Sequence, residues 1–205
     1  MSFKTVKKEA SAEFVEKRSR FIGYIRPVRT EAEAVAFVNE IRAAHRDATH
    51  NCYAYTVREN NMTRYSDDGE PHGTAGLPIL EVLRGAELCD AAVVVTRYFG
   101  GTLLGTGGLV RAYTRGAQEA VAAGGIAEIA ECARLRLLFE YSYFERVKLL
   151  LEREGGVLLD QQFSDRVALE VRLRSERRER FEAALVDLSF GSAEVQFLGT
   201  VLAAE

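Results

Sequence analysis

The sequence is short of cysteine and has no pattern that would link its cysteines into a framework. The three cysteines, Cys52, Cys89 and Cys132, lie far apart, and no Cys-x-x-Cys pair is present. An odd number of widely spaced cysteines argues against both a disulfide scaffold and a zinc ribbon. Each lies in an apolar run, which is typical of a buried thiol in a reducing compartment.

Signals for membranes and secretion are also missing. No stretch approaches the roughly 20 apolar residues that a membrane-spanning helix needs, and residues 1–8 contain no apolar core of a signal peptide. The formal net charge of −3 gives no general attraction to nucleic acid or to anionic lipid. We therefore expect a cytoplasmic protein without a membrane partner, in which any basic binding face is a local patch.

Established catalytic and nucleotide-binding motifs are absent as well. A Walker A loop fails because Gly105 is followed by Thr106 and Gly107, and a Rossmann fingerprint from Gly105 fails because position 110 is Val110. Gly-x-Ser-x-Gly, His-Glu-x-x-His and an EF-hand loop are missing, as are an RNA-recognition signature, a helix-turn-helix and a zinc finger. The sequence thus predicts no cofactor and no metal, and it identifies no catalytic residue.

The residues that are present predict a packed α+β protein. Hydrophobic residues make up 47% and charged residues 28% of the 205 positions, which fits one large or two small domains. In the first part, apolar spacing predicts a strand pair over 12–28 broken at 16–20, and a helix over 31–46 with a capping box of Thr30 and Glu33. It further predicts a strand at 51–58, a polar loop at 59–75, a helix at 76–84, a buried strand at 91–96 and a helix at 107–122.

The remainder predicts a second domain. Strands and helices alternate in the order β-α-β-β-α-β, with capping serines expected at Ser142 (paired with Glu145) and Ser175. This is the ferredoxin-like arrangement. The predicted domains are residues 1–127 and 128–205.

A glycine-rich segment, residues 97–111, runs from the buried strand into the last helix of the first domain. Backbone N–H groups at a helix N-terminus favour an anion, and hydroxyl and guanidinium groups in the segment add donors. The candidate anion- or partner-binding residues are Arg97, Tyr98, Gly100, Gly101, Thr102, Gly105, Thr106 and Arg111. The alternative is that these glycines only allow close packing of helix on strand.

An acidic-histidine loop, residues 66–76, is the second candidate. It holds Asp67, Asp68, Glu70 and His72, and His50 lies upstream. A carboxylate beside a histidine suits acid–base work or a divalent metal, although the spacing matches no metal motif. The alternative is a tight polar turn in which Asp67 or Asp68 holds an arginine, either Arg64 or Arg97.

Aromatic and basic residues form a third group. Exposed aromatic rings beside arginine stack on unpaired bases, whereas alternate strand residues such as Tyr53 and Tyr55 are expected in a core. The group comprises Tyr53, Tyr55, Tyr65, Tyr98 and Phe99 with Lys17, Arg18, Arg20 and Arg58.

Four stretches resemble the IMPACT family in its YigZ-like bacterial form. They are KRSRFI at 17–22, ATHNCYAY at 48–55, SDDGEP with GTAG at 66–71 and 73–76, and VTRYFGGTLLG at 95–105. The resemblance implies a first domain like the second domain of a small-subunit ribosomal protein and a second domain like the C-terminal domain of elongation factor G. It also implies a link to translation, because eukaryotic relatives, which carry an additional N-terminal domain, bind a translation activator.

We therefore expect a translation-associated regulatory protein that binds RNA, the ribosome or a translation-factor protein. The alternative is a hydrolase or transferase acting on a phosphorylated or peptide-like small molecule. Both readings require the acidic-histidine loop and the glycine-rich segment to meet on one solvent-reachable side. The oligomeric state is left open.

Overall fold

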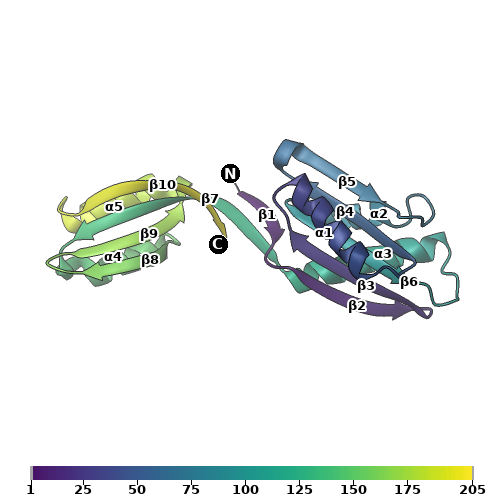
Figure 1. The fold of residues 1–205 in the computed structure, drawn as a ribbon. Helices are drawn as coiled ribbons and strands as arrows, with labels where there is room; N and C mark the ends of the chain where they lie inside the picture. Colours follow the sequence, from purple (N-terminus) through teal and green to yellow (C-terminus); the bar gives the residue numbers. More distant parts are fainter. Residues whose placement is uncertain (1, 205) are drawn as a thin grey trace. The chain divides into compact units, whose positions relative to one another are not determined.

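The computed structural model describes residues 2–204, and they form two compact units (Figure 1). The first is Phe3–Glu128, and the second is residues 129–204 together with Ser2. Each unit combines helices with an antiparallel sheet. The predicted two-domain α+β fold is thereby confirmed. Among residues 2–204, no helix has both the length and the apolar character needed to cross a membrane.

The first unit is built on a sheet of order β2-β3-β6-β4-β5. The strands of this sheet are β2 (Ala10–Glu16), β3 (Ser19–Pro27), β4 (His50–Val57), β5 (Met62–Ser66) and β6 (Ala91–Tyr98), and β1 (Ser2–Val6) precedes them in the chain. Its helices are α1 (Glu31–Ala44), α2 (Gly76–Gly85) and α3 (Thr106–Gly124). Strand β1 is not part of this sheet; its neighbour is β7 (Ile126–Phe139).

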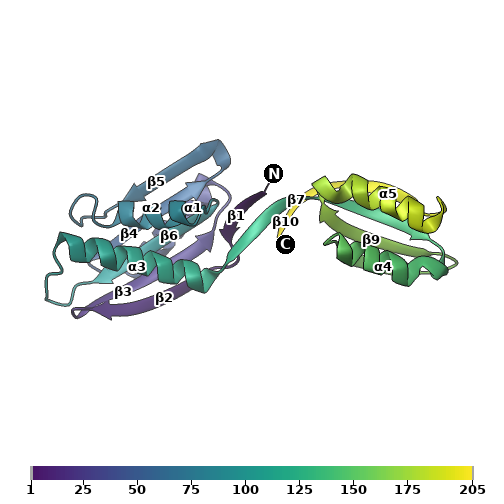
Figure 2. The ribbon, with the colours of Figure 1, turned by 180° about the vertical axis from the view of Figure 1, so that it is seen from behind.

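The sheet of the first unit is covered on both faces. Helix α1 covers one face and helices α2 and α3 cover the other (Figures 1 and 2). Successive residues of β6 therefore point into two different cores, Val93 and Val95 into one and Ala92 and Val94 into the other. The continuous apolar run of this strand follows from its central position, as the sequence predicted.

The second unit has the order β7 (Ile126–Phe139), α4 (Phe144–Arg153), β8 (Val157–Phe163), β9 (Val167–Arg174), α5 (Arg178–Ser189) and β10 (Glu194–Ala204). Its antiparallel strands lie in the order β10-β7-β9-β8. Both helices bury their apolar residues against the alternate residues of β7 and β9. The ferredoxin-like β-α-β-β-α-β prediction is confirmed.

Three local predictions are wrong. The polar loop at 59–75 contains strand β5, whose edge position lets it pair with β4 without burying a hydrophobic face. Neither Ser142 nor Ser175 caps a helix, because each lies in a short 3-10 turn that precedes α4 or α5. The cap of α1 is confirmed in Thr30, which accepts from the backbone N–H of Glu33, while the Glu33 carboxylate accepts from the N–H of Arg29.

Candidate functional site

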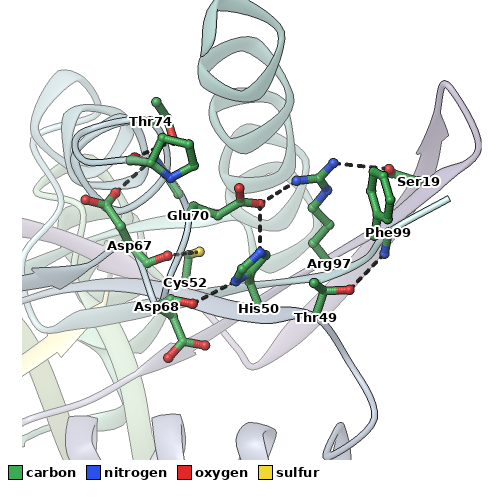
Figure 3. Close-up of polar contacts among 12 residues, drawn as sticks. Ser19, Thr49, His50, Cys52, Asp67, Asp68, Glu70, Thr74, Arg97 and Phe99 are labelled. Atoms are coloured by element: carbon green, nitrogen blue, oxygen red, sulfur yellow. Dashed lines mark hydrogen bonds and ion pairs between the residues drawn. The ribbon is translucent and has the colours of Figure 1, made fainter. Parts of the chain in front are cut away.

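The acidic-histidine loop and the glycine-rich segment meet at the end of β4 and β6. His50 and Arg97 are register partners on these two strands, so their side chains share one face of the sheet. The loop folds back over them and brings Glu70 between them (Figure 3). A hollow of about 460 Å³, the loop pocket, opens here; it is lined by His50, Glu70, Arg97, Thr49, Gly69, Pro71, Phe99, Leu103, Leu104, Gly105, Thr106 and Leu109.

A buried ion pair forms the polar floor of the loop pocket. The Arg97 Nη1 donates to Glu70 Oε1 at 2.6 Å, and the two side chains are only 6% and 4% exposed. The Tyr113 hydroxyl donates to the same carboxylate oxygen at 2.7 Å, and the second guanidinium nitrogen of Arg97 reaches the Ser19 hydroxyl at 3.3 Å. The Nε of Arg97 is buried and has no hydrogen-bond partner among residues 2–204. Most of the Arg97 charge is therefore neutralised by Glu70 inside the protein.

The tautomer of neutral His50 is set by the loop. Its Nδ1 lies 2.8 Å from the backbone carbonyl of Asp68, which only accepts hydrogen bonds, so Nδ1 carries the proton. The lone pair is then at Nε2, which lies 3.8 Å from Glu70 Oε1 and lines the loop pocket. His50 thus offers an acceptor to any group bound there.

Asp67 holds the loop in shape by capping helix α2. Its carboxylate accepts backbone N–H groups of Gly73, Ala75 and Gly76 at 2.8, 3.0 and 2.8 Å. Burial disfavours its charge, but these donors outweigh burial and lower the pKa of Asp67 below its ordinary value. The adjacent Asp68 accepts from Arg42 and from the N–H of Asn51, both at 2.7 Å. Of the two aspartates, Asp68 therefore holds an arginine, and that arginine is Arg42, not Arg64 or Arg97.

Among residues 2–204, no cysteine or serine lines the loop pocket. Cys52 is fully buried, its thiol donates to the Asp67 carbonyl at 2.9 Å, and burial raises the pKa of the thiol. A buried thiol with a raised pKa is unreactive. Within residues 2–204, no three His, Cys, Asp or Glu side chains are placed to hold a metal ion together.

The glycines of the glycine-rich segment have different tasks. A Cβ on Gly100 would lie 2.0 Å from the backbone of Arg18, and its N–H donates to Ser19, so this glycine serves packing. Gly105 has a φ of 73° and begins helix α3 without any side-chain cap. Thr106, the first residue of α3, lines the loop pocket, and its backbone N–H has no acceptor within the helix, so it can donate to a group bound there.

A second hollow, the basic groove, lies beside the first. Its volume is about 200 Å³, and it is lined by Phe14, Glu16, Lys17, Leu104, Gly108, Arg111, Ala112 and Arg115. Leu104 lines both hollows and so separates them. Arg115 is paired with Glu119, whereas Lys17 and Arg111 make no ion pair within the described residues. Lys17 and its neighbour Arg18 hold left-handed backbone conformations, a strain of about 1 kcal/mol or more each for residues with a side chain.

The structure brings together only part of the predicted set. His50, Glu70, Arg97, Gly105 and Thr106 line the loop pocket. The others do not line it: His72, whose side chain is 96% exposed, Asp67, Asp68, Tyr98, Gly100, Gly101, Thr102 and Arg111, which lines the basic groove instead. Tyr98 points to the opposite face, where its hydroxyl contacts His45 and Asp47.

Several residues of the site were not identified as candidates from the sequence. Ser19 and Tyr113 support the ion pair, and Thr49, Leu103, Leu104 and Leu109 complete the walls. Phe99 was predicted only as part of the aromatic group; its ring is 46% exposed and lies 5.4 Å from the Arg97 guanidinium. Tyr113 was visible only as a member of the apolar stripe of α3, because nothing in that stripe marks a hydroxyl that reaches a carboxylate 43 positions earlier.

Comparisons with known proteins assign both parts of the chain. Residues 17–121 match the Impact N-terminal domain, and residues 137–192 match a domain of unknown function, DUF1949. A solved structure titled "Crystal structure of an hypothetical protein" is 33% identical, with a TM-score of 0.61 over 97% of this chain and 98% of that one.

Named relatives cover most of the chain. "IMPACT family member YvyE" of Bacillus subtilis is 36% identical over 95% of this chain and 90% of its own length. "IMPACT family member YigZ" of Escherichia coli is 36% identical over 87% of this chain and 89% of its own length. Eukaryotic relatives named IMPACT also match, among them one from Xenopus laevis. With both domain models matched and relatives of this similarity along nearly its whole length, the chain belongs to the IMPACT family, in the branch of YvyE and YigZ.

Proposed function

We propose that the protein is a cytoplasmic, translation-associated binding protein that holds RNA, free or within the ribosome, on its N-terminal domain. The match to eukaryotic proteins named IMPACT supports the link to translation, which the family resemblance implies. The observation that carries the RNA assignment is the basic groove. Its lining includes Glu16, but its exposed cations Lys17 and Arg111 make no ion pair with any residue of 2–204. In a protein of net charge −3, such a local pair of free cations suits a phosphate backbone.

Ribosome pelleting tests this proposal. The protein should sediment with ribosomes at low salt and be released steeply as salt rises, because phosphate contacts displace counterions. Arg111→Glu should weaken sedimentation strongly. Lys8→Glu, an equal charge change at an exposed lysine outside both hollows, should leave it nearly unchanged.

Two results would refute the RNA assignment. The first is a protein that stays in the supernatant at low salt and recovers no RNA from lysate. The second is sedimentation that Arg111→Glu and Lys8→Glu weaken equally, since this would reflect total charge rather than the groove.

An enzyme is the second candidate, and one observation favours it. In its neutral form, His50 has an unprotonated Nε2 beside the loop pocket, as a general base requires. Because the Cys52 thiol is buried, we expect such an enzyme to use His50 to activate water. Turnover of phosphate esters or peptides that disappears in His50→Gln would favour this candidate, and we expect no turnover.

A further inference from the structure

The two hollows beside Leu104 differ in chemistry, and the difference indicates what kind of RNA fits. The basic groove offers cations at its surface. The loop pocket offers a floor whose charges cancel, because Glu70 and Arg97 neutralise each other. A charged phosphate suits the first hollow, and an uncharged group suits the second.

The walls of the loop pocket fit a flat, uncharged heterocycle. Phe99 presents a half-exposed ring, and Leu103 and Leu104 add apolar surface. A nucleobase stacks on such a ring whatever its identity. The volume of about 460 Å³ lies within the range of roughly 300–1,000 Å³ usual for small-molecule sites.

Polar groups for the edge of a base are present at the same walls. The Nε2 of His50, in the neutral form of the ring, can accept, and the backbone N–H and hydroxyl of Thr106 can donate. Donors and an acceptor together match the mixed edge of a base better than they match a phosphate, which only accepts from protein N–H groups.

We propose that the N-terminal domain binds single-stranded RNA by taking one unstacked base into the loop pocket and the adjoining phosphate into the basic groove. This inference rests on the proposed RNA-binding function. It adds that the RNA is single-stranded and that one of its bases occupies the loop pocket. A duplex keeps its bases stacked, so it reaches the basic groove but not the loop pocket.

Fluorescence anisotropy with three labelled probes tests the inference on the full chain. The probes are a short unstructured RNA, its duplex with the complementary strand, and the same strand with its bases removed. The single strand should bind at least about fivefold more tightly than either of the others, which is the effect of one stacked base. Phe99→Ala should abolish that preference and leave duplex binding unchanged.

Matched variants separate the two hollows. Tyr65→Ala removes an aromatic ring of similar exposure, 43%, from the edge strand β5 of the same unit and should change nothing. Leu103→Ser, at a residue 82% exposed, should weaken single-strand binding without loss of fold. Lys17→Gln and Arg111→Gln should weaken all three probes and lower the salt dependence, each by about one phosphate contact.

Equal affinity for single strand, duplex and abasic strand, unchanged by Phe99→Ala, would overturn the base pocket while leaving RNA binding by the groove intact. Failure of all three probes to bind would overturn the proposed function together with the inference.

Discussion

At the scale of single residues, the pocket floor depends on the ion pair of Glu70 and Arg97. Both side chains are almost fully buried, and each is the principal partner of the other. A buried charge that loses its partner is costly because the low-polarity interior cannot replace it, whereas an exposed pair contributes little.

Arg97→Met should therefore lower the free energy of unfolding by about 3–5 kcal/mol. Arg84→Met, which removes an exposed partner of Glu81, should cost less than about 1 kcal/mol. Urea unfolding measures both. A small loss in Arg97→Met would mean that the pair is not a structural element of the pocket.

Asp67 gives a second prediction, which concerns pH. Because its pKa is lower in the folded protein than its ordinary value of 3.8, its contribution is present above that value and is lost as the pH falls through the lower folded pKa. Asp67→Asn should cost about 1 kcal/mol near neutral pH, because both carboxylate oxygens accept N–H groups and the amide nitrogen cannot, and this cost should shrink in acid.

Urea unfolding at about pH 7 and about pH 3 checks this dependence. Asp160→Asn, at an exposed aspartate of β8, should have almost no effect at either pH. A cost in Asp67→Asn that does not change with pH would contradict the capping role of the charge.

The sequence identified these residues but not their partners. His50, Glu70 and Arg97 stand out as polar residues near glycine-rich turns, yet the sequence could not show that Glu70, not Asp67 or Asp68, holds Arg97. That pairing spans 27 positions and depends on the fold of the loop over the β4–β6 register. Local spacing carries no information on such a contact.

At the scale of elements, the glycine-rich segment combines close packing with a helix start. Gly100 lies against the backbone of the hairpin turn between β2 and β3, whereas Gly107 lies inside the first turn of α3 with only the Arg111 side chain near. Gly100 thus has no room for a side chain, whereas Gly107 has room for one.

Gly100→Ala should destabilise the protein by about 1–3 kcal/mol, because a Cβ 2.0 Å from backbone atoms forces the turn at Arg18 to move. Gly107→Ala should be neutral or stabilising by up to about 1 kcal/mol, since alanine favours helix. Thermal unfolding compares the two. Equal effects would show that close packing at Gly100 is not what requires glycine there.

Helices and strands were predicted correctly where burial gives their apolar residues a clear period along the chain, and they were missed where it does not. The strand at 91–96 and the helix at 107–122 were predicted because each buries a full face or stripe. Strand β5 was missed because its residues are exposed or half-buried and its pairing with β4 is mainly a backbone interaction. The expected caps at Ser142 and Ser175 failed because 3-10 turns open both helices.

At the scale of the whole molecule, the order of elements was enough to predict a ferredoxin-like second domain, since six elements in this order have few other arrangements. The assembly of the candidate site was expected only as a requirement of function. The division into a neutral pocket and a basic groove depends on where Leu104 lies between them, which no sequence pattern indicates.

The most direct test of the account is ultraviolet cross-linking of the full chain to single-stranded RNA, followed by mass spectrometry of the modified peptides. We predict cross-links concentrated in residues 97–111, with Phe99 the principal site, and their loss when Lys17 and Arg111 are both replaced by glutamine. Cross-links located mainly beyond residue 128, or none at Phe99 while RNA is bound, would contradict the account.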